Sequence, residues 1–183
     1  GIANDDLTLE LSSKVGNALT ILKEKPLIVI GTDTRTSRDM LKSAFMSGVL
    51  AGGGNVVDLG ILTTPAISYI TTLYKADFGV VISASHNPPE YNGIKIFDNL
   101  GAKLGEAERD FIEDCINKNK TNYSQDFGTM EDDLISHERY INFLADSVDT
   151  DLSGLKVVLD CSNGASFEVA PKLFQKLGAQ VFC

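Results

Sequence analysis

The sequence lacks several features that would place it in a membrane, in a secretion pathway or on nucleic acid. No apolar run in its 183 residues approaches the roughly 18 residues that span a bilayer. No basic segment followed by an apolar one stands at its start, as a signal peptide would. Lys and Arg number 16 against 25 Asp and Glu, without a basic cluster, which argues against a nucleic-acid surface. These absences predict a cytoplasmic protein with neither a membrane nor a nucleic-acid partner. Anionic small molecules stay open as ligands, because a local site can be positive on an acidic protein.

Cysteine and histidine are also scarce. The three cysteines, Cys115, Cys161 and Cys183, are widely spaced and form no Cys-x-x-Cys pair. An odd number at such spacing predicts reduced thiols, with neither a disulfide framework nor a zinc site. His137 has no His or Cys at ligand spacing beside it, so we predict a solvated helix residue there.

What the sequence does contain is a regular alternation of short apolar runs and helix-period segments. Apolar runs bounded by Gly or Pro predict strands, and longer segments with one apolar face predict helices. This alternation predicts an α/β fold, a three-layer α/β/α domain with a mixed, mostly parallel sheet. We expect Asn4 and Asp5 to cap the first helix. The expected strands are 27–30, 55–59, 78–82 and 94–97, and the expected helices are 7–25, 37–50, 65–74, 106–117 and 134–148.

The polar residues 149–154 form the predicted boundary between two domains, 1–150 and 151–183. Beyond it we expect a buried strand at 155–160, a helix through Leu177 and a strand from Gln180. One strand-helix-strand unit is too small to bury its own faces. We therefore expect it to open a second, similar domain, and the chain to be a fragment of a longer protein. Before the boundary, 118–130 is predicted to be a surface connector and Glu131-Asp132-Asp133 a solvated charge run.

The stretch 78–97 is the part of the chain that the rest is organised around. Two predicted strands flank a polar loop in which Pro88 and Pro89 disfavour helix, and Asn92-Gly93 is a hairpin-type turn signal. Ser85, His86 and Lys95 bring a hydroxyl, an imidazole and an ammonium to this loop and its second strand. That grouping could place a nucleophile beside an acid–base group and a cation. A simple connector is about as good an interpretation of the residues alone, because neighbouring residues in a strand point to opposite faces.

A second candidate site follows the first predicted strand. Gly31-Thr32-Asp33-Thr34-Arg35 leads from that strand into a helix, and helix N-terminal amides point toward anions at such junctions. No Gly-Lys-Ser/Thr follows, so this is not a Walker A loop. Arg35 would position either the serine loop or a phosphate. A surface arginine paired with Asp33 or Asp39 is the alternative.

Several motifs together resemble one protein family. Ser83-Ala84-Ser85-His86-Asn87-Pro88, followed by Tyr91-Asn92-Gly93-Ile94-Lys95, is similar to the phosphoserine loop of the α-D-phosphohexomutases. The chain most resembles the bacterial phosphoglucosamine mutase branch of that family. The similarity extends to four further motifs, Gly1-Ile2-Ala3-Asn4, Gly31-Thr32-Asp33-Thr34-Arg35, Gly60-Ile61-Leu62-Thr63-Thr64-Pro65 and Leu159-Asp160-Cys161-Ser162-Asn163-Gly164-Ala165.

The resemblance implies an isomerase, an intramolecular phosphotransferase that interconverts glucosamine 6-phosphate and glucosamine 1-phosphate for amino-sugar nucleotide and cell-wall synthesis. It implies that Ser85 carries the phosphate and that a bisphosphorylated sugar is the intermediate. His86 and Lys95 are the implied catalytic partners, and Arg35 and Asn87 the implied phosphate-binding or substrate-binding residues. A homodimer is left open.

The resemblance also implies cofactors. Mg²⁺ would be held by the phosphate on Ser85 and by three aspartates of an Asp-x-Asp-x-Asp motif that this chain lacks. A hexose bisphosphate would act as primer. We therefore expect this chain alone to be inactive. The alternatives are a phosphomannomutase/phosphoglucomutase and a non-catalytic folding or oligomerisation module.

Overall fold

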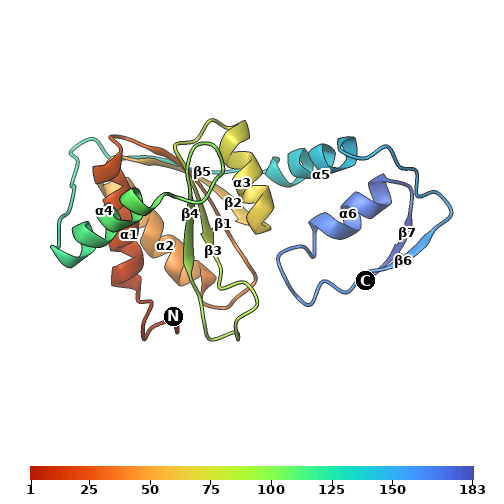
Figure 1. Cartoon of the computed structure of the whole chain (residues 1–183), viewed down its shortest axis with the longest axis horizontal. Coiled ribbons are helices and arrows are strands. Elements are labelled where there is room, and N and C mark those ends of the chain that lie inside the picture. Colours follow the sequence, from red (N-terminus) through yellow and green to blue (C-terminus); the bar gives the residue numbers. More distant parts are fainter.

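A computed structural model describes residues 1–183 as a layered α/β body followed by a smaller unit (Figure 1). The longest helices have 14 residues, and no helix has the length and apolar character that crossing a membrane requires. The elements are α1 (Leu9–Leu22), β1 (Leu27–Thr32), α2 (Arg38–Ala51), β2 (Asn55–Ile61), α3 (Thr64–Leu73), β3 (Phe78–Ile82), β4 (Ile94–Phe97), α4 (Glu106–Asn117), β5 (Met130–Asp132), α5 (Ser136–Asp146), β6 (Lys156–Val158), α6 (Val169–Lys176) and β7 (Gln180–Phe182).

The main sheet has five strands in the order β4-β3-β1-β2-β5. β1 pairs in parallel with both β2 and β3, and β2 pairs in parallel with β5. β4 is antiparallel to β3. The predicted α/β class with a mixed, mostly parallel sheet is therefore confirmed. β2 pairs with one edge of the central strand β1, and the next strand along the chain, β3, pairs with the other edge. Sheets of this kind bind ligands in the crevice at the carboxyl ends of the strands where the strand order reverses. Here that crevice lies between the carboxyl ends of β1 and β3.

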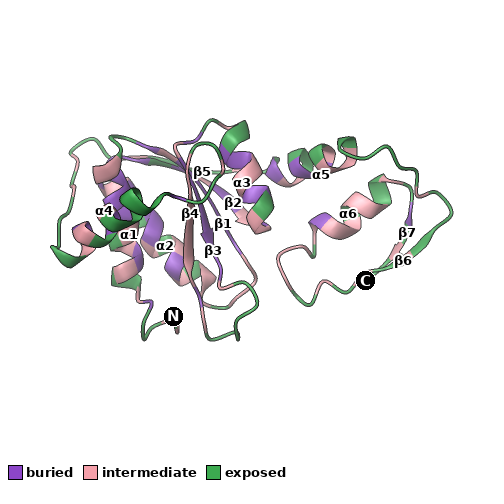
Figure 2. Cartoon of the chain, in the orientation of Figure 1, coloured by how far each residue is buried: buried purple, intermediate pink, exposed green.

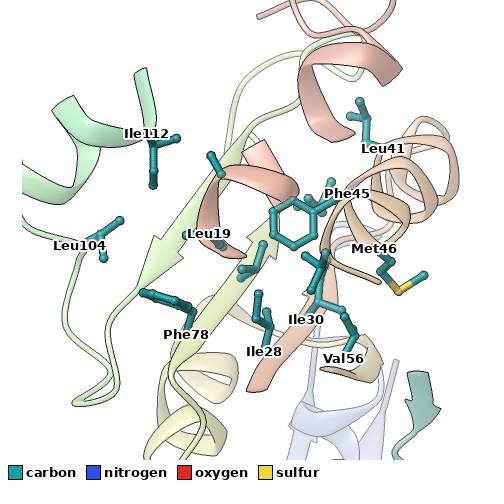
Figure 3. Close-up of a cluster of buried hydrophobic side chains, with 14 of the residues drawn as sticks. Leu19, Ile28, Ile30, Leu41, Phe45, Met46, Val56, Phe78, Leu104 and Ile112 are labelled. Atoms are coloured by element: carbon teal, nitrogen blue, oxygen red, sulfur yellow. The ribbon is translucent and has the colours of Figure 1, made fainter. Parts of the chain in front are cut away.

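Two hydrophobic clusters hold the helices on opposite faces of the sheet. One joins α1, α2 and α4 to the sheet around the fully buried Phe45, which lies among Leu19, Ile28 and Ile30 in Figure 3. The other joins α3 and α5 to the opposite face through Ile67, among others. In Figure 2 buried residues concentrate in the sheet and on the helix faces turned toward it. Residues of β1 alternate between the two clusters, as a strand with both faces covered requires.

The first helix begins later than the sequence predicted. Asn4 and Asp5 lie in a turn before α1, and Asn4 has a left-handed φ of 66°. Thr8 is the N-cap, and its hydroxyl accepts a hydrogen bond from Leu11 N at 3.2 Å. The predicted cap at Asn4-Asp5 was therefore wrong, because Ile2 O already accepts the Asp5 and Asp6 amides and closes that turn.

The acidic run at 131–133 was predicted to be a solvated charge run, and Glu131 and Asp132 are indeed exposed, whereas Asp133 is half-buried. Its first two residues belong to the edge strand β5, where Glu131 pairs with Val57 and Asp132 pairs with Asp58. Asp133 accepts hydrogen bonds from the amides of Ile135 and Ser136 and from the Tyr74 hydroxyl. The carboxylate thus satisfies free amides at the start of α5, a role that depends on where β5 ends.

His137 was predicted to be a solvated helix residue and is instead half-buried in the first turn of α5. Its Nε2 lies 2.8 Å from the carbonyl oxygen of Ile61, at the end of β2. The imidazole therefore ties α5 to the sheet.

The C-terminal unit pairs β6 and β7 in parallel and carries α6 beside them. The prediction of a buried strand at 155–160 was wrong, because β6 is short and Leu155 and Val158 are 53% and 81% exposed. No further strand or helix covers this small sheet in Figure 2. Val169 of α6 packs into the cluster that contains Tyr140 and Ile141 of α5. The division of the chain at residue 150 stays a prediction.

Two glycines allow α1 and α2 to cross in close contact. A Cβ on Gly48 would lie 2.0 Å from the Ser13 carbonyl oxygen, and one on Gly16 would lie 2.2 Å from the Phe45 carbonyl oxygen. Both neighbours are backbone atoms within helices, so they cannot move aside alone. The contact between these helices therefore depends on the missing side chains.

We expect Gly48→Ala to destabilise the chain by about 1–3 kcal/mol, because overpacking must separate the two helices. The roughly 1 kcal/mol that Ala gains over Gly in helix propensity opposes this loss. Urea unfolding followed by circular dichroism measures the difference, with Ser47→Ala at the exposed neighbouring position of α2 as control. A Gly48→Ala variant more stable than the parent would contradict the packing argument.

Candidate functional site

A polar cleft of about 590 Å³ lies at the carboxyl ends of β1, β2 and β3. Three loops that follow these strands form one side, and a loop of the C-terminal unit forms the other. Only one of its 16 lining residues is hydrophobic, so the cleft suits a ligand rich in hydrogen-bonding groups. The lining residues are Asp33, Thr34, Arg35, Thr36, Thr63, Thr64, Pro65, Ser83, Ser85, Asn87, Pro89, Ser162, Asn163, Gly164, Ala165 and Ser166.

Ser85 lies in this cleft with an unusual backbone conformation. Its φ is 57°, in the left-handed region that non-glycine residues rarely adopt, and its side chain is exposed. The Ser85 amide donates to the Ser83 hydroxyl at 3.0 Å. Ser83 is itself buried, and its amide donates to the Gly93 carbonyl at 2.9 Å. The left-handed conformation is thus held by neighbouring contacts, as strained backbone at functional sites commonly is.

Lys95 brings a cation directly to Ser85. The two strands β3 and β4 place Lys95 opposite Val81, and its Nζ lies 2.5 Å from Ser85 Oγ. Partial burial is the main cause that lowers the pKa of the Lys95 ammonium from its ordinary value. Repulsion from Lys103 and Arg35 adds to this effect, whereas the charge of Asp33 opposes it. A partly desolvated ammonium beside an exposed hydroxyl can stabilise negative charge that develops on that oxygen.

Arg35 does not behave as a surface arginine. Its side chain is only 9% exposed, and Nε donates to Asp33 Oδ2 at 3.0 Å. Nη1 donates to the carbonyls of Pro88 and Tyr91 at 2.5 and 2.8 Å. Nη2 donates to the carbonyls of Ser85 and Asn87 at 3.0 and 2.7 Å. The guanidinium therefore contacts the serine loop at four carbonyl oxygens.

The other two predicted site residues are placed differently. Asn87 lines the cleft, whereas His86 is exposed and is not among the lining residues. The structure thus brings Ser85, Arg35 and Asn87 together in the cleft lining and Lys95 into contact with Ser85, whereas His86 is exposed and does not line the cleft.

Asn92-Gly93 does not form the predicted hairpin turn. Asn92 is buried, and its Nδ2 donates to the hydroxyl of Ser37 at 2.9 Å, next to the start of α2. Its Oδ1 accepts the Gly93 amide at 2.8 Å. The segment between β3 and β4 is a long loop whose far end is fixed to the α2 terminus, so the turn chemistry of a two-residue hairpin does not apply.

Sequence reasoning missed three contributors to the cleft. Asp33 was treated only as a partner of a surface arginine, and Ser83 was not singled out as a structural residue. No site role was predicted for the loop 162–166, yet it lines the cleft, and Thr34 Oγ1 donates to the Asn163 carbonyl at 2.5 Å. The left-handed φ values of Ser162 and Asn163 would have been hard to read from the sequence, although Asn followed by Gly is a turn signal.

The residues of this chain do not by themselves fit a magnesium site. No group of three or more His, Cys, Asp or Glu residues is arranged to hold a metal ion. Asp33 is the carboxylate that lines the cleft, and both of its oxygens accept hydrogen bonds from Arg35. A metal at Ser85 would depend on ligands that this chain does not supply.

The fold and the cleft define an α/β domain that presents a serine, in contact with a lysine, at the carboxyl edge of a mostly parallel sheet. Residues 1–123 match the family model described as phosphoglucomutase/phosphomannomutase, alpha/beta/alpha domain I. Two curated relatives are both named phosphoglucosamine mutase. The one from Caldanaerobacter subterraneus subsp. tengcongensis is 50% identical over 99% of this chain and 42% of the relative. The one from Clostridium acetobutylicum is 47% identical over 99% of this chain and 42% of the relative.

A solved structure agrees with the sequence relatives. A phosphoglucomutase/phosphomannomutase family protein from Burkholderia thailandensis superposes with a TM-score of 0.84 and 26% identity, over 100% of this chain and 41% of that protein. The chain belongs to the phosphoglucomutase/phosphomannomutase family and contains its α/β/α domain I. It spans about two fifths of the length of the relatives it matches.

The lowered pKa of Lys95 gives a prediction about stability and pH. Because the folded chain binds this proton less tightly than the unfolded chain, stability should rise with pH between the lowered folded pKa and the ordinary value of 10.5. Lys95→Met should remove that rise. Urea unfolding of both proteins from neutral pH to pH 10.5, with an NMR titration of the Lys95 side chain, measures it. A Lys95 that titrates at or above its ordinary value would refute the desolvation argument.

Proposed function

We propose that this chain is the phosphoserine-bearing part of a phosphosugar mutase that interconverts glucosamine 6-phosphate and glucosamine 1-phosphate. The observation that carries the proposal is the contact of Lys95 Nζ with Ser85 Oγ in a polar cleft. The high identity to proteins named phosphoglucosamine mutase supports the choice of an aminosugar substrate. The product would feed amino-sugar nucleotide and cell-wall synthesis.

The proposed reaction stores a phosphoryl group on Ser85. A free hydroxyl of the hexosamine monophosphate attacks the phosphorus, and the bond from phosphorus to Ser85 Oγ breaks. The proton of the attacking hydroxyl ends on Ser85 Oγ, which is thereby returned to a neutral hydroxyl. The bisphosphorylated sugar then turns within the cleft and returns its other phosphate to Ser85. Covalent storage splits one difficult transfer into two easier ones, since a serine hydroxyl is a weak nucleophile by itself.

In this proposal each site residue has one role. Lys95 supplies positive charge at the transferring phosphoryl group, because phosphoryl transfer depends mainly on positioning and charge neutralisation. Asn87 offers an amide group to the substrate from the cleft wall. His86, which is exposed on the same loop, is the proposed acid–base group. Arg35 was proposed for phosphate binding or loop positioning, and its contacts favour positioning.

The family suggests a metal cofactor, and we propose Mg²⁺ with a hexose bisphosphate as primer. A divalent ion would neutralise charge on the phosphate of Ser85. Its other ligands would have to come from outside this chain, which has no suitable cluster. We therefore propose that these 183 residues alone do not complete the catalytic cycle. A cytoplasmic location and a homodimer remain predictions.

Two alternatives stay open for the activity. A phosphomannomutase/phosphoglucomutase is favoured by the description of the family model and by the solved relative from Burkholderia thailandensis. Its domain I would present the same cleft, so a comparison of glucosamine, glucose and mannose phosphates as substrates separates the two. A non-catalytic folding or oligomerisation module is the other alternative. It would carry no phosphate on Ser85.

We expect the whole protein to be phosphorylated on Ser85. Intact-mass measurement followed by peptide mapping should locate one phosphate there, and Ser85→Ala should abolish both the phosphate and the mutase activity. Ser43→Ala, at an exposed position of α2 away from the cleft, is the control and should change neither. Phosphate found only on Ser83, or activity that survives Ser85→Ala, would contradict the assignment.

We expect Lys95→Met in the whole protein to lower kcat on the order of a hundredfold, the usual loss for one electrostatic stabiliser. Steady-state kinetics with glucosamine 6-phosphate or glucosamine 1-phosphate measures the effect. Lys103→Met, at an exposed nearby position, tests whether loss of any local positive charge suffices. A loss below about threefold with folding intact would return Lys95 to the class of surface lysines.

A further inference from the structure

We propose that Arg35, oriented by Asp33, is a positioning residue that clamps the serine loop and has no donor left for a phosphate. Its consequence for catalysis rests on the function proposed above, whereas its effect on the loop does not. The Asp33–Arg35 clamp, as we call this pair, joins the end of β1 to the loop that follows β3.

The hydrogen bonds of Arg35 leave the guanidinium fully occupied. A guanidinium has five N–H donors in a fixed plane. Nε uses its one donor on Asp33, Nη1 uses two on Pro88 and Tyr91, and Nη2 uses two on Ser85 and Asn87. A phosphate could bind Arg35 only by displacing one of these carbonyls. The donor count therefore favours a structural contact over a ligand contact.

Asp33 sets the direction of the guanidinium. Its Oδ2 accepts from Arg35 Nε at 3.0 Å, and its Oδ1 accepts from the Arg35 backbone amide at 3.0 Å. The Asp33 amide in turn donates to the carbonyl of Ile82, the last residue of β3, at 3.2 Å. The two side chains are only 15% and 9% exposed, so the ion pair is partly shielded from water.

The clamp acts where the loop has few backbone contacts, at 84–89. The far end of the loop is held separately, since the Ala3 amide donates to the Glu90 carbonyl and the Asn92 amide to the Gly1 carbonyl. Pro88 and Pro89 have no amide donors, and 86–90 are exposed. Within the loop, the Asn87 amide bonds to Ala84 and the Tyr91 amide bonds to Pro88. The Pro88 carbonyl thus accepts both the Tyr91 amide and Arg35, whereas the Ser85 and Asn87 carbonyls have Arg35 as their hydrogen-bond partner. One buried cation gathers four loop carbonyls at a single point.

The clamp acts on Ser85 from one side and Ser83 acts from the other. Arg35 Nη2 holds the Ser85 carbonyl at 3.0 Å, and Ser83 Oγ holds the Ser85 amide at 3.0 Å. The peptide units on both sides of Ser85 are therefore fixed, and Ser85 Oγ accepts a hydrogen bond from Lys95 Nζ. Loss of the clamp should release the left-handed strain and separate hydroxyl from ammonium.

The experiment compares Arg35→Lys with the parent, using NMR-detected hydrogen exchange of the 183-residue chain. Lysine keeps the charge but cannot bind four carbonyls and a carboxylate at once. We expect at least tenfold faster exchange of the Ser85, Asn87 and Tyr91 amides, with the amides of β1 and β3 unchanged. Arg38→Lys, an arginine that contacts Asp39 and the Thr34 carbonyl, is the matched control and should leave the loop unchanged.

Asp33→Asn is the second variant, used where Arg35→Lys does not fold. It keeps the acceptor for the Arg35 amide and weakens only the hold on Nε, so a smaller acceleration of the same three amides is expected. Unchanged loop exchange in a folded Arg35→Lys or Asp33→Asn chain would overturn the clamp. This readout needs no catalytic activity, so it decides the clamp even if the mutase proposal fails.

Kinetics of the whole protein separate positioning from phosphate binding. A clamp predicts that Arg35→Lys lowers kcat tenfold or more, with KM for the sugar phosphate changed less than threefold. A phosphate ligand predicts that KM rises tenfold while the loop exchanges as in the parent, and that result would overturn the proposal.

Discussion

The contact of one guanidinium with four carbonyl oxygens is the interaction on which the site depends. Arg35 follows β1, at the centre of the sheet, and it binds the loop between β3 and β4. The parallel pairing of β1 with β3 brings the carboxyl ends of these strands together, and hence the arginine to the loop. The hydrophobic clusters on both faces fix that pairing, so the geometry around Ser85 follows from the core.

The chemistry that the cleft can perform depends on which of its charged side chains are already paired with other groups. Asp33 and Arg35 neutralise one another and the loop carbonyls, which leaves Lys95 as the cation in contact with the serine hydroxyl. The rest of the lining is mostly hydroxyl and amide groups from four separate loops. Such a surface suits a ligand that is rich in hydrogen-bonding groups.

The sequence predicted the main domain well wherever apolar residues recur at the spacing of a strand or a helix. The strand Ile94–Phe97 and the helix Glu106–Asn117 begin and end where the residues indicated, because a turn or Gly bounds each side. The β6 segment shows the limit of the same reasoning. Apolar residues at 155–160 predicted a buried strand, yet burial depends on which other segments cover the strand, and here few do. Asp133 shows a similar limit of prediction from sequence. Its carboxylate caps α5 only because β5 ends next to the start of that helix.

By itself the sequence determined the α/β class, the strand and helix segments, and the loop that presents Ser85 between two strands, because hydrophobic period and turn residues are local properties. The resemblance of several motifs determined the family, which the comparisons confirm. Only the tertiary structure decided that Lys95 contacts Ser85 Oγ, that Arg35 uses all of its donors on the loop and Asp33, and that His86 does not line the cleft. These outcomes join residues as many as 56 positions apart, and strand register and side-chain packing set such distances, which no local pattern records.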